Sequence, residues 1–258
     1  DWVLCAKESG PEVEPTHLLA RGRVHSPREV VDPGFPPVLC KDDAASHAPP
    51  PTPLAENNSS GRRTVLADWI TDPAHPTTAR VIANRVWLWH FGQGLVTTPN
   101  DFGQMGQLPT HPELLDWLAA ELIDNGQSIK SIQRQIVTSS VYRQTSEHRE
   151  QASRKDASNQ FLWRMNRRRL EAEEIRDAIL STSGRLDNRM YGAGDYLFVL
   201  EKTGHSPHYE YYKHDPEDPA SHRRTIYRFI VRSQPDPFMT TLDCADSSQS
   251  TPTRNETL

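Results

Sequence analysis

The chain has 258 residues, of which 35% are hydrophobic, 8% aromatic and 24% charged, and its formal net charge is −5. This composition allows a substantial buried core and excludes a disordered chain. The net negative charge argues against nucleic acid as a partner, and no apolar run is long enough to span a membrane. The chain begins with neither Met nor a signal peptide and ends in what reads as continuing sequence, so we expect a segment of a longer protein.

Residues 1–61 differ in composition from the rest of the chain. Short apolar stretches at 16–22 and 30–39 are interrupted by proline and glycine, and proline has no N–H to donate within a sheet. These stretches predict an extended arm with edge strands at best. Residues 45–62 are rich in proline, serine and asparagine, which is typical of a linker. The predicted organisation is an arm and linker over 1–61 and a helical domain over 62–258 that is truncated at its C-terminus.

Apolar residues recur at helical spacing after the linker. The pattern predicts helices over 62–71, 77–91 and 170–183, with two more between Thr110 and Asn125 and from Ser128 onward. The helix over 77–91 is apolar around much of its circumference and should be the central buried helix. The β-branched and aromatic run 225–231 predicts a minor β element. The expected fold class is mainly α, with a core that includes Trp69, Ile82, Val86, Trp89, Leu114, Leu118 and Ile136.

Polar residues interrupt the apolar surface of the predicted central helix. A buried Asn84 or Arg85 costs free energy unless it is hydrogen-bonded, so we expect Arg85 to pair with a carboxylate such as Asp101 or Glu174. Extending this argument predicts one polar network where three helices meet, made of Asn84, Arg85, Tyr142, Arg143, Glu174 and Asp177. An architectural role is favoured for it, and the alternative is that the network lines a pocket.

Four residues are candidates for acid–base catalysis. Asp101 and His111 flank a glycine-containing loop, while Glu171 and Glu174 lie one helical turn apart. A structural role competes with the catalytic one in each case. Thr110 and Glu113 form a capping-box pattern next to His111, and the two glutamates are equally suited to salt bridges with arginine.

Histidines and cysteines offer no compact metal motif. His205, His208 and His214 are the nearest approach to a ligand cluster, but spacing alone does not make their side chains converge, and a surface loop is favoured. Cys5, Cys40 and Cys244 are widely spaced and form no CxxC or CxxCH motif, so this segment lacks an attachment site for c-type haem. A bridge between Cys5 and Cys40 is compatible with an oxidising compartment.

Several ordered motifs together carry a family resemblance. They are Arg80-x3-Asn84-Arg85-x-Trp87-x3-Phe91-Gly92-x-Gly94, Pro99-x-Asp101-Phe102-Gly103, His111-Pro112-Glu113-Leu114-Leu115-Asp116-Trp117-Leu118 and Arg169-Leu170-x-Ala172-Glu173-x-Ile175-Arg176-Asp177. The chain resembles the planctomycete-type domain of unknown function 1553 from about Thr16 to its end. The resemblance implies an exported protein, periplasmic or at the cell surface, in which this domain follows a c-type cytochrome domain and a second uncharacterised domain. It carries over no catalytic residue, and any haem would belong to the upstream domain.

Two functions are compatible with these observations. The first is a non-haem module that binds substrate or docks to the cytochrome domain in a redox-linked process. The alternative is a hydrolase or lyase acting on polysaccharide, with Asp101, Glu171 or Glu174 as the acid–base pair and tryptophans stacking on sugar rings. Such an enzyme requires two carboxyl groups roughly 5–9.5 Å apart beside an exposed aromatic residue, whereas a docking module requires those acids to be paired with arginines and an apolar patch to be exposed.

Overall fold

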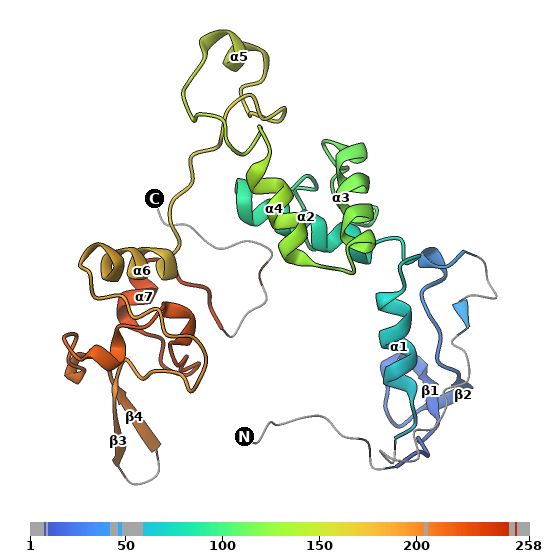
Figure 1. The fold of residues 1–258 in the computed structure, drawn as a ribbon. Coiled ribbons are helices and arrows are strands. Elements are labelled where there is room, and N and C mark those ends of the chain that lie inside the picture. The colour runs from blue at the N-terminus through green and yellow to red at the C-terminus, as the bar shows by residue number, and fades with distance from the viewer. Residues whose placement is uncertain are drawn as a thin grey trace. The chain divides into compact units, whose positions relative to one another are not determined.

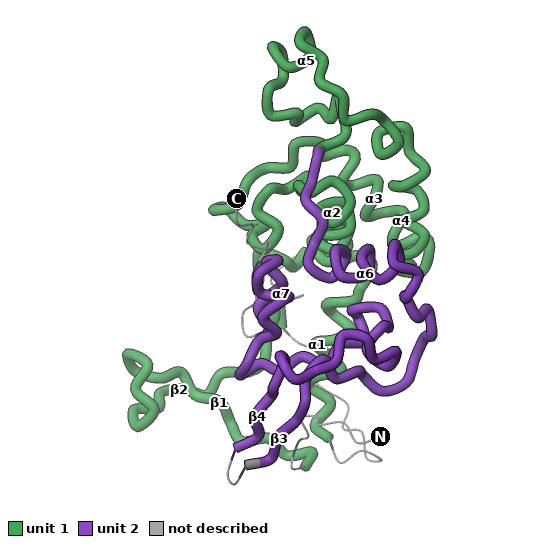
Figure 2. The backbone as a smooth tube through the Cα atoms, turned by 90° about the vertical axis from the view of Figure 1, so that its left-hand side faces the viewer, with its two compact units in different colours: residues 1–166 green, residues 167–258 purple. Residues whose placement is uncertain are grey.

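The computed structural model describes residues 8, 10–41, 46–47, 59–203, 206–247 and 251. The chain forms two compact units, residues 1–166 and residues 167–258 (Figure 2). This division falls inside the range 62–258, over which the sequence predicts a single helical domain. A domain boundary is set by which segments share a core, and helical periodicity does not report that.

The first unit begins with a small hairpin. Strands β1 (Thr16–Leu19) and β2 (Pro27–Val31) pair antiparallel, with Thr16 opposite Val31 and a register irregularity before Leu19. Farther along the arm, the ring of Phe35 stacks on Trp69 with centroids 4.4 Å apart. Trp69 belongs to helix α1 (Arg62–Thr71). The arm therefore packs on the first helix through an aromatic pair.

Helices α2 (Thr78–Phe91), α3 (Pro112–Asp124) and α4 (Ile129–Thr138) pack together and form the core of the first unit (Figure 1). Their buried side chains join the loop residues Leu95 and Val96 in one apolar cluster. Gly92 ends α2 in a left-handed conformation, with φ 78°. Ser128 caps α4 as its position predicts, because its hydroxyl accepts a hydrogen bond from Ser131 N. The capping box predicted at Thr110 is absent, and His111 stands at the N-cap of α3 without a side-chain cap bond.

Three of the seven predicted core residues are buried, three are half-buried and one is exposed; Trp69 is half-buried against Phe35, outside the main apolar cluster. Val86, Leu118 and Ile136 are buried as predicted, and Ile82 and Leu114 are half-buried against the same cluster. Trp89 is 57% exposed, so its assignment to the core was wrong. The core-facing side of α2 carries Trp87 and Phe91, whose rings stack 4.1 Å apart. Because helical residues two apart point in different directions, Trp89 is turned toward solvent.

The second unit contains little regular structure. Its elements are helix α6 (Ala172–Thr182), the antiparallel hairpin β3 (Val199–Thr203) and β4 (Ser206–Glu210), helix α7 (Pro237–Thr241) and several short 3-10 turns. Within the described part of the chain there are thus seven α-helices, counting the short α5 (Glu150–Lys155), and two small antiparallel sheets. The fold combines helices with minor β structure. Its secondary structure is therefore more mixed than the mainly α class that the sequence predicts. None of the helices in the described ranges is long and apolar enough to cross a membrane.

The strand predicted over 225–231 is wrong. Thr225–Tyr227 is a 3-10 turn. Within 225–231, the β contact that the structure describes is an isolated bridge between Asp195 and Arg228. The carboxylate of Asp177 on α6 accepts hydrogen bonds from both the backbone N and the hydroxyl of Thr225, at 2.7 and 2.6 Å. These bonds fix the turn, so a tertiary contact overrides the β propensity of the run.

Candidate functional site

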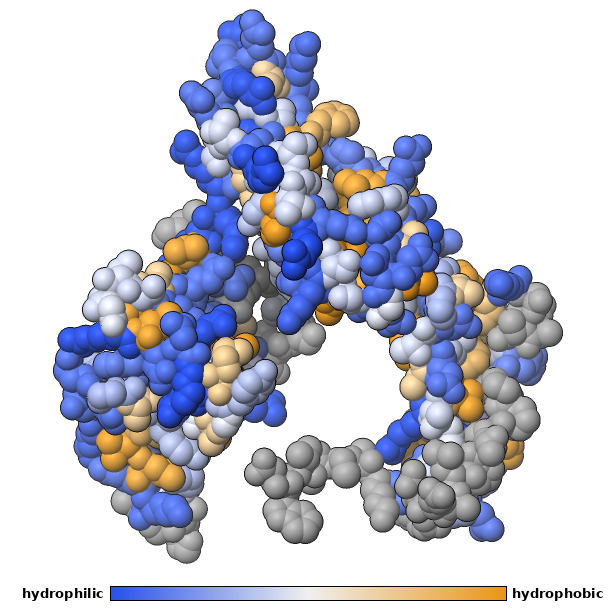
Figure 3. Space-filling view, viewed as in Figure 1, coloured by the Kyte–Doolittle hydropathy of each residue, from blue (hydrophilic) through white to orange (hydrophobic). Residues whose placement is uncertain are grey.

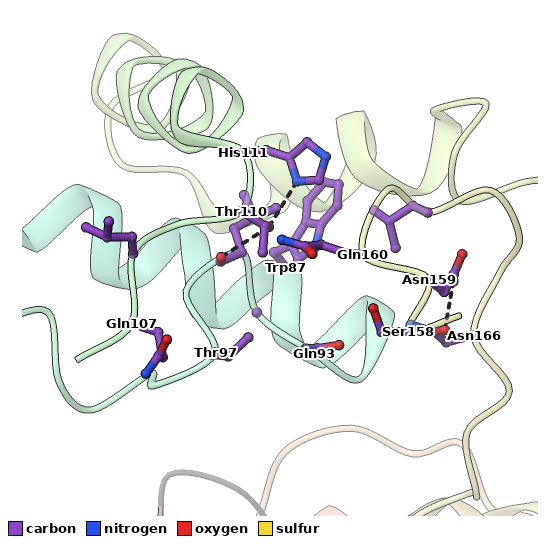
Figure 4. Close-up of a pocket in the computed structure, with 14 residues that line it drawn as sticks. Trp87, Gln93, Thr97, Gln107, Thr110, His111, Ser158, Asn159, Gln160 and Asn166 are labelled. Carbon is purple, nitrogen blue, oxygen red and sulfur yellow. Dashed lines mark hydrogen bonds between the residues drawn. The ribbon is translucent and has the colours of Figure 1, made fainter. Parts of the chain in front are cut away.

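A pocket of about 260 Å³ lies in the first unit, beside the C-terminal end of α2 (Figure 4). Three loops that are far apart in the sequence contribute to its wall, at 93–97, 107–111 and 158–166. The wall is rich in uncharged polar side chains. Its amides are Gln93, Gln107, Asn159, Gln160 and Asn166, and its hydroxyls are Thr97, Thr110 and Ser158. Trp87, Leu95, Leu108 and Leu162 supply apolar surface.

Asn84 holds the first of these loops in place. Its Nδ2 donates to Val96 O at 3.0 Å, and its Oδ1 accepts from Val96 N at 2.8 Å. These two bonds clamp the backbone of Val96 to α2. Next to this clamp, Leu95 O accepts hydrogen bonds from both the backbone N and the hydroxyl of Thr110, at 2.8 and 3.3 Å. Thr110 Oγ1 also lies 2.9 Å from His111 Nδ1. Through Val96, Leu95 and Thr110, the buried side chain of Asn84 is thereby connected to the histidine of the pocket, and Figure 4 draws the last bond of this series, between Thr110 and His111.

Gly94 lies within this clamp and lines the pocket. A Cβ at this position would lie 2.6 Å from Val96 O and 2.8 Å from Asn84 Oδ1. We expect Gly94→Ala to lower the free energy of unfolding by about 1–3 kcal/mol, as for overpacking of a filled interior. Gly103→Ala is the matched control, because its nearest neighbour is an exposed carboxylate oxygen at 3.2 Å, and its cost should stay within about 0.5 kcal/mol. Equal urea midpoints for the two variants would contradict the clamp.

The segment after α5 forms the opposite wall. The carboxylate of Asp156 accepts hydrogen bonds from the backbone N of Gln160 and of Phe161, at 2.9 and 2.8 Å. Partial desolvation raises the pKa of Asp156, but these hydrogen bonds outweigh it and hold the pKa below its usual value. Asn159 Nδ2 donates to Asn166 Oδ1 at 2.9 Å, and Asn166 Nδ2 donates to Phe91 O at 3.3 Å. The segment is therefore fastened to the end of α2.

An aromatic residue stands next to the pocket histidine. Phe161 is 70% exposed, and its ring lies edge-on to the ring of His111 with centroids 6.0 Å apart. Among the described residues that line the pocket, His111 is the only titratable side chain. The arrangement suits hydrogen bonding to an uncharged ligand, and it brings no pair of acids together.

The other catalytic candidates are engaged in local structure. Asp101 Oδ1 accepts a hydrogen bond from Gly103 N at 2.8 Å, which orders the loop after α2. Glu171 and Glu174 form a capping box at the start of α6, in the second unit, and Glu174 Oε1 lies 3.1 Å from Arg168 Nη2. Of the four candidates, the structure brings only His111 into this pocket.

The predicted polar network involves both units. Asn84 is fully buried and hydrogen-bonded, as its place on an apolar helix indicates. Arg85 Nη2 donates to an amide oxygen, Asn100 Oδ1, at 2.5 Å, and the expected pairing of Arg85 with a carboxylate stays a prediction. Arg85 is only half-buried, so its charge requires no ionic partner.

The remaining members also have local contacts. Tyr142 packs edge-on against Phe91 at 5.7 Å, and Arg143 N donates to Ser139 O at 3.2 Å. In the second unit, Asp177 holds Thr225. A single network joining Arg85, Tyr142 and Arg143 with Glu174 and Asp177 stays a prediction, because these residues belong to different units.

The histidine and cysteine candidates form no metal centre in the part of the chain that the structure describes. No group of three or more His, Cys, Asp and Glu side chains there could hold an ion. His208 is exposed on β4, His214 follows a 3-10 turn, and His205 lies outside the described residues. Cys5 lies outside them as well, so its predicted bridge to Cys40 is untested, and Cys40 Sγ lies 3.4 Å from Pro36 O.

Sequence reasoning missed most of the pocket. Residues 158–160 read as an ordinary polar loop, and nothing in their spacing relates them to Gln93 or Gln107. Two signals were available. One was Asn84 on an apolar helix, and the other was the glycine at 94 two residues before the buried Val96.

The family is identified by the sequence of residues 62–258. The profile described as PSD1, protein of unknown function (DUF1553), matches residues 62–258, which is more than half of the chain. The chain therefore belongs to the DUF1553 family, as the ordered motifs around Asn84, His111 and Glu173 indicate. No curated protein and no solved structure is significantly similar to it.

Proposed function

We propose that this chain is the substrate-binding module of an exported multidomain protein, and that its ligand is neutral and rich in hydroxyl groups, such as a segment of a polysaccharide. The observation that carries the proposal is the wall of the pocket in the first unit. That wall combines amides and hydroxyls with an adjacent exposed aromatic ring.

The hydrogen-bonding groups of the wall suit sugar hydroxyls. A hydroxyl group both donates and accepts, and a side-chain amide offers an acceptor and two donors within one group. Gln93, Gln107 and Gln160 therefore match a ligand whose polar groups alternate between the two roles. The edge-on pair of His111 and Phe161 adds apolar surface on which the C–H face of a ring can rest.

The charge of the wall favours an uncharged ligand. Phosphate, sulfate and carboxylate groups are bound in proteins chiefly by arginine and lysine, because charged hydrogen bonds are the stronger ones. Among the described lining residues there is no lysine, arginine, aspartate or glutamate. A polyanionic ligand would lose its hydration here without gaining an ion pair.

The redox setting of this module is part of the proposal. The family resemblance supports a c-type cytochrome domain upstream as the partner, with no cofactor bound by this segment. On the face drawn in Figure 3 the apolar residues form small separate groups within a hydrophilic surface, so that face offers no large apolar patch for docking.

No observation favours the alternative of a hydrolase or lyase that uses paired carboxylates. Asp101 orders a loop, while Glu171 and Glu174 cap a helix. None of them lines the pocket that carries the amides. The binding function is therefore the one that the geometry supports best.

Phe161→Ala tests the proposal. We expect the whole chain to bind at least one neutral glycan in a panel of dextran, mannan and xylan, and to bind dextran sulfate more weakly than dextran. Removing the exposed ring should weaken binding of the neutral glycan by about fivefold, which corresponds to an aromatic contact of about 1 kcal/mol. Isothermal titration calorimetry measures both effects.

Trp117→Ala is the matched control, because Trp117 is a half-exposed aromatic residue of the same unit that does not line the pocket. It should leave glycan affinity unchanged. Tighter binding of dextran sulfate than of dextran, or equal affinities for the native chain and Phe161→Ala, would overturn the proposal.

A further inference from the structure

Three glutamine side chains in the wall of the glycan pocket are available to a ligand. Gln93, Gln107 and Gln160 come from three different loops, and all three are exposed (Figure 4). Gln107 and Gln160 are held through their backbone N–H groups, which donate to Thr98 Oγ1 at 3.0 Å and to Asp156 Oδ1 at 2.9 Å. Within the described part of the chain, their side-chain amides have no hydrogen-bond partner. The loops are therefore fixed in place while the amides remain open to a ligand.

An accessible leucine stands near a glutamine in each of two opposite walls. Leu108 directly follows Gln107, lines the pocket and is 88% exposed. In the segment after α5, Leu162 follows Gln160 by two residues, also lines the pocket and is half-buried. Each of these walls thus offers an amide and an aliphatic side chain close together.

This pairing distinguishes between the substituents that a neutral sugar can carry. A hydroxyl group can bond to the glutamine amide, but it gains nothing from the leucine beside it. An acetamido group has an N–H donor, a C=O acceptor and a methyl group. Its two polar groups match the acceptor and donors of a glutamine amide, and its methyl group leaves water against the leucine.

We propose that the glycan bound in this pocket carries acetamido groups, as in a polymer of N-acetylhexosamine. This inference rests on the proposed glycan-binding function and specifies its ligand. The acetamido group bonds to Gln107 or Gln160, and its methyl group packs against Leu108 or Leu162. The group is uncharged, in keeping with the absence of Lys, Arg, Asp and Glu among the described residues that line the pocket.

The test compares chitotriose, the trimer of N-acetylglucosamine, with cellotriose by isothermal titration calorimetry on the whole chain. The two trimers share the same linkage and differ only in carrying an acetamido or a hydroxyl group at one carbon of each ring. We expect both to bind, and chitotriose to bind about fivefold more tightly, which is the effect of one methyl group removed from water. The trimer of glucosamine keeps the nitrogen but lacks the acetyl group, so it should bind more weakly than chitotriose.

Two variants locate the acetamido group. Leu108→Ala removes the aliphatic contact, and Met105→Ala is its matched control, because Met105 is also 88% exposed in the same loop but does not line the pocket. Gln160→Leu removes the amide, and its control is Gln104→Leu, at an exposed glutamine away from the pocket wall. The preference for chitotriose should fall in Leu108→Ala, in Gln160→Leu or in both, and it should persist in the controls. All four side chains are exposed, so the melting temperatures should stay native.

The outcomes separate this inference from the proposed function. If neither trimer binds, the proposed function fails and the inference fails with it. If cellotriose binds as tightly as chitotriose or more tightly, the glycan-binding function stands and the acetamido inference is overturned. A preference that is unchanged in both Leu108→Ala and Gln160→Leu would overturn it too, because the acetamido group would then lie away from both walls. Tighter binding of the glucosamine trimer than of chitotriose would likewise contradict recognition of the acetyl group.

Discussion

Replacing Asn84 with leucine is expected to destabilise the first unit by roughly 3–5 kcal/mol. Asn84 is fully buried, and both polar atoms of its side chain bond to the backbone of Val96. Leucine has a similar size but leaves the N–H and the C=O of Val96 without these partners, and each buried group without a partner costs about 1–3 kcal/mol. The loop that carries Gly94 and Leu95 would lose its attachment to α2, so glycan binding should fall as well.

Urea denaturation followed by tryptophan fluorescence measures the loss of stability, and hydrogen exchange at Val96 N locates it. Asn125→Leu is the control. Asn125 is exposed at the end of α3, where its side chain bonds to Glu121 O at 2.8 Å, and its replacement should cost less than about 1 kcal/mol. If hydrogen exchange at Val96 N stays as slow in the Asn84→Leu variant as in the native protein, the clamp at Asn84 is contradicted.

Arg223→Met should destabilise the second unit by a similar amount, about 3–5 kcal/mol, the usual cost of removing one partner from a buried ion pair. Arg223 is only 4% exposed. Its guanidinium donates to Ala193 O at 2.9 Å and to Tyr191 O at 2.6 Å, and it lies 3.3 Å from Asp195 Oδ1. The same group stands 3.8 Å above the ring of Tyr227.

Methionine would fill much of the space of Arg223 but would leave Asp195 and two carbonyls unpaired. Arg223→Lys keeps the charge but cannot reproduce the planar fork, so its loss should be intermediate. Arg189→Met is the control, because Arg189 is exposed and its contact with Asp187 is 3.5 Å long. Thermal unfolding measures all three variants. Equal melting temperatures for Arg223→Met and Arg189→Met would show that the buried arginine is not the main link between 189–195 and 223–227.

These two residues differ in how visible they are in the sequence. Asn84 stands out as a polar residue within an apolar helical repeat, and its buried, hydrogen-bonded state follows from that contrast. Arg223 lies in an irregular region rich in polar residues, where no periodicity separates a buried side from an exposed one. Its importance becomes apparent only when the carbonyls of 191 and 193 are seen to converge on it.

By itself, the sequence determined helices α1 to α4, the burial of Val86, Leu118 and Ile136 and the membership of the DUF1553 family, but not the short helix α5. Each depends on local spacing or on an ordered series of motifs, which a linear reading can recover. Tertiary structure alone decided the boundary after Asn166, the turn at Thr225 and the pocket beside α2. These features arise where segments distant in the sequence meet. A hydrogen bond such as that from Thr225 N to the carboxylate of Asp177 can then outweigh the intrinsic preference of the segment it joins.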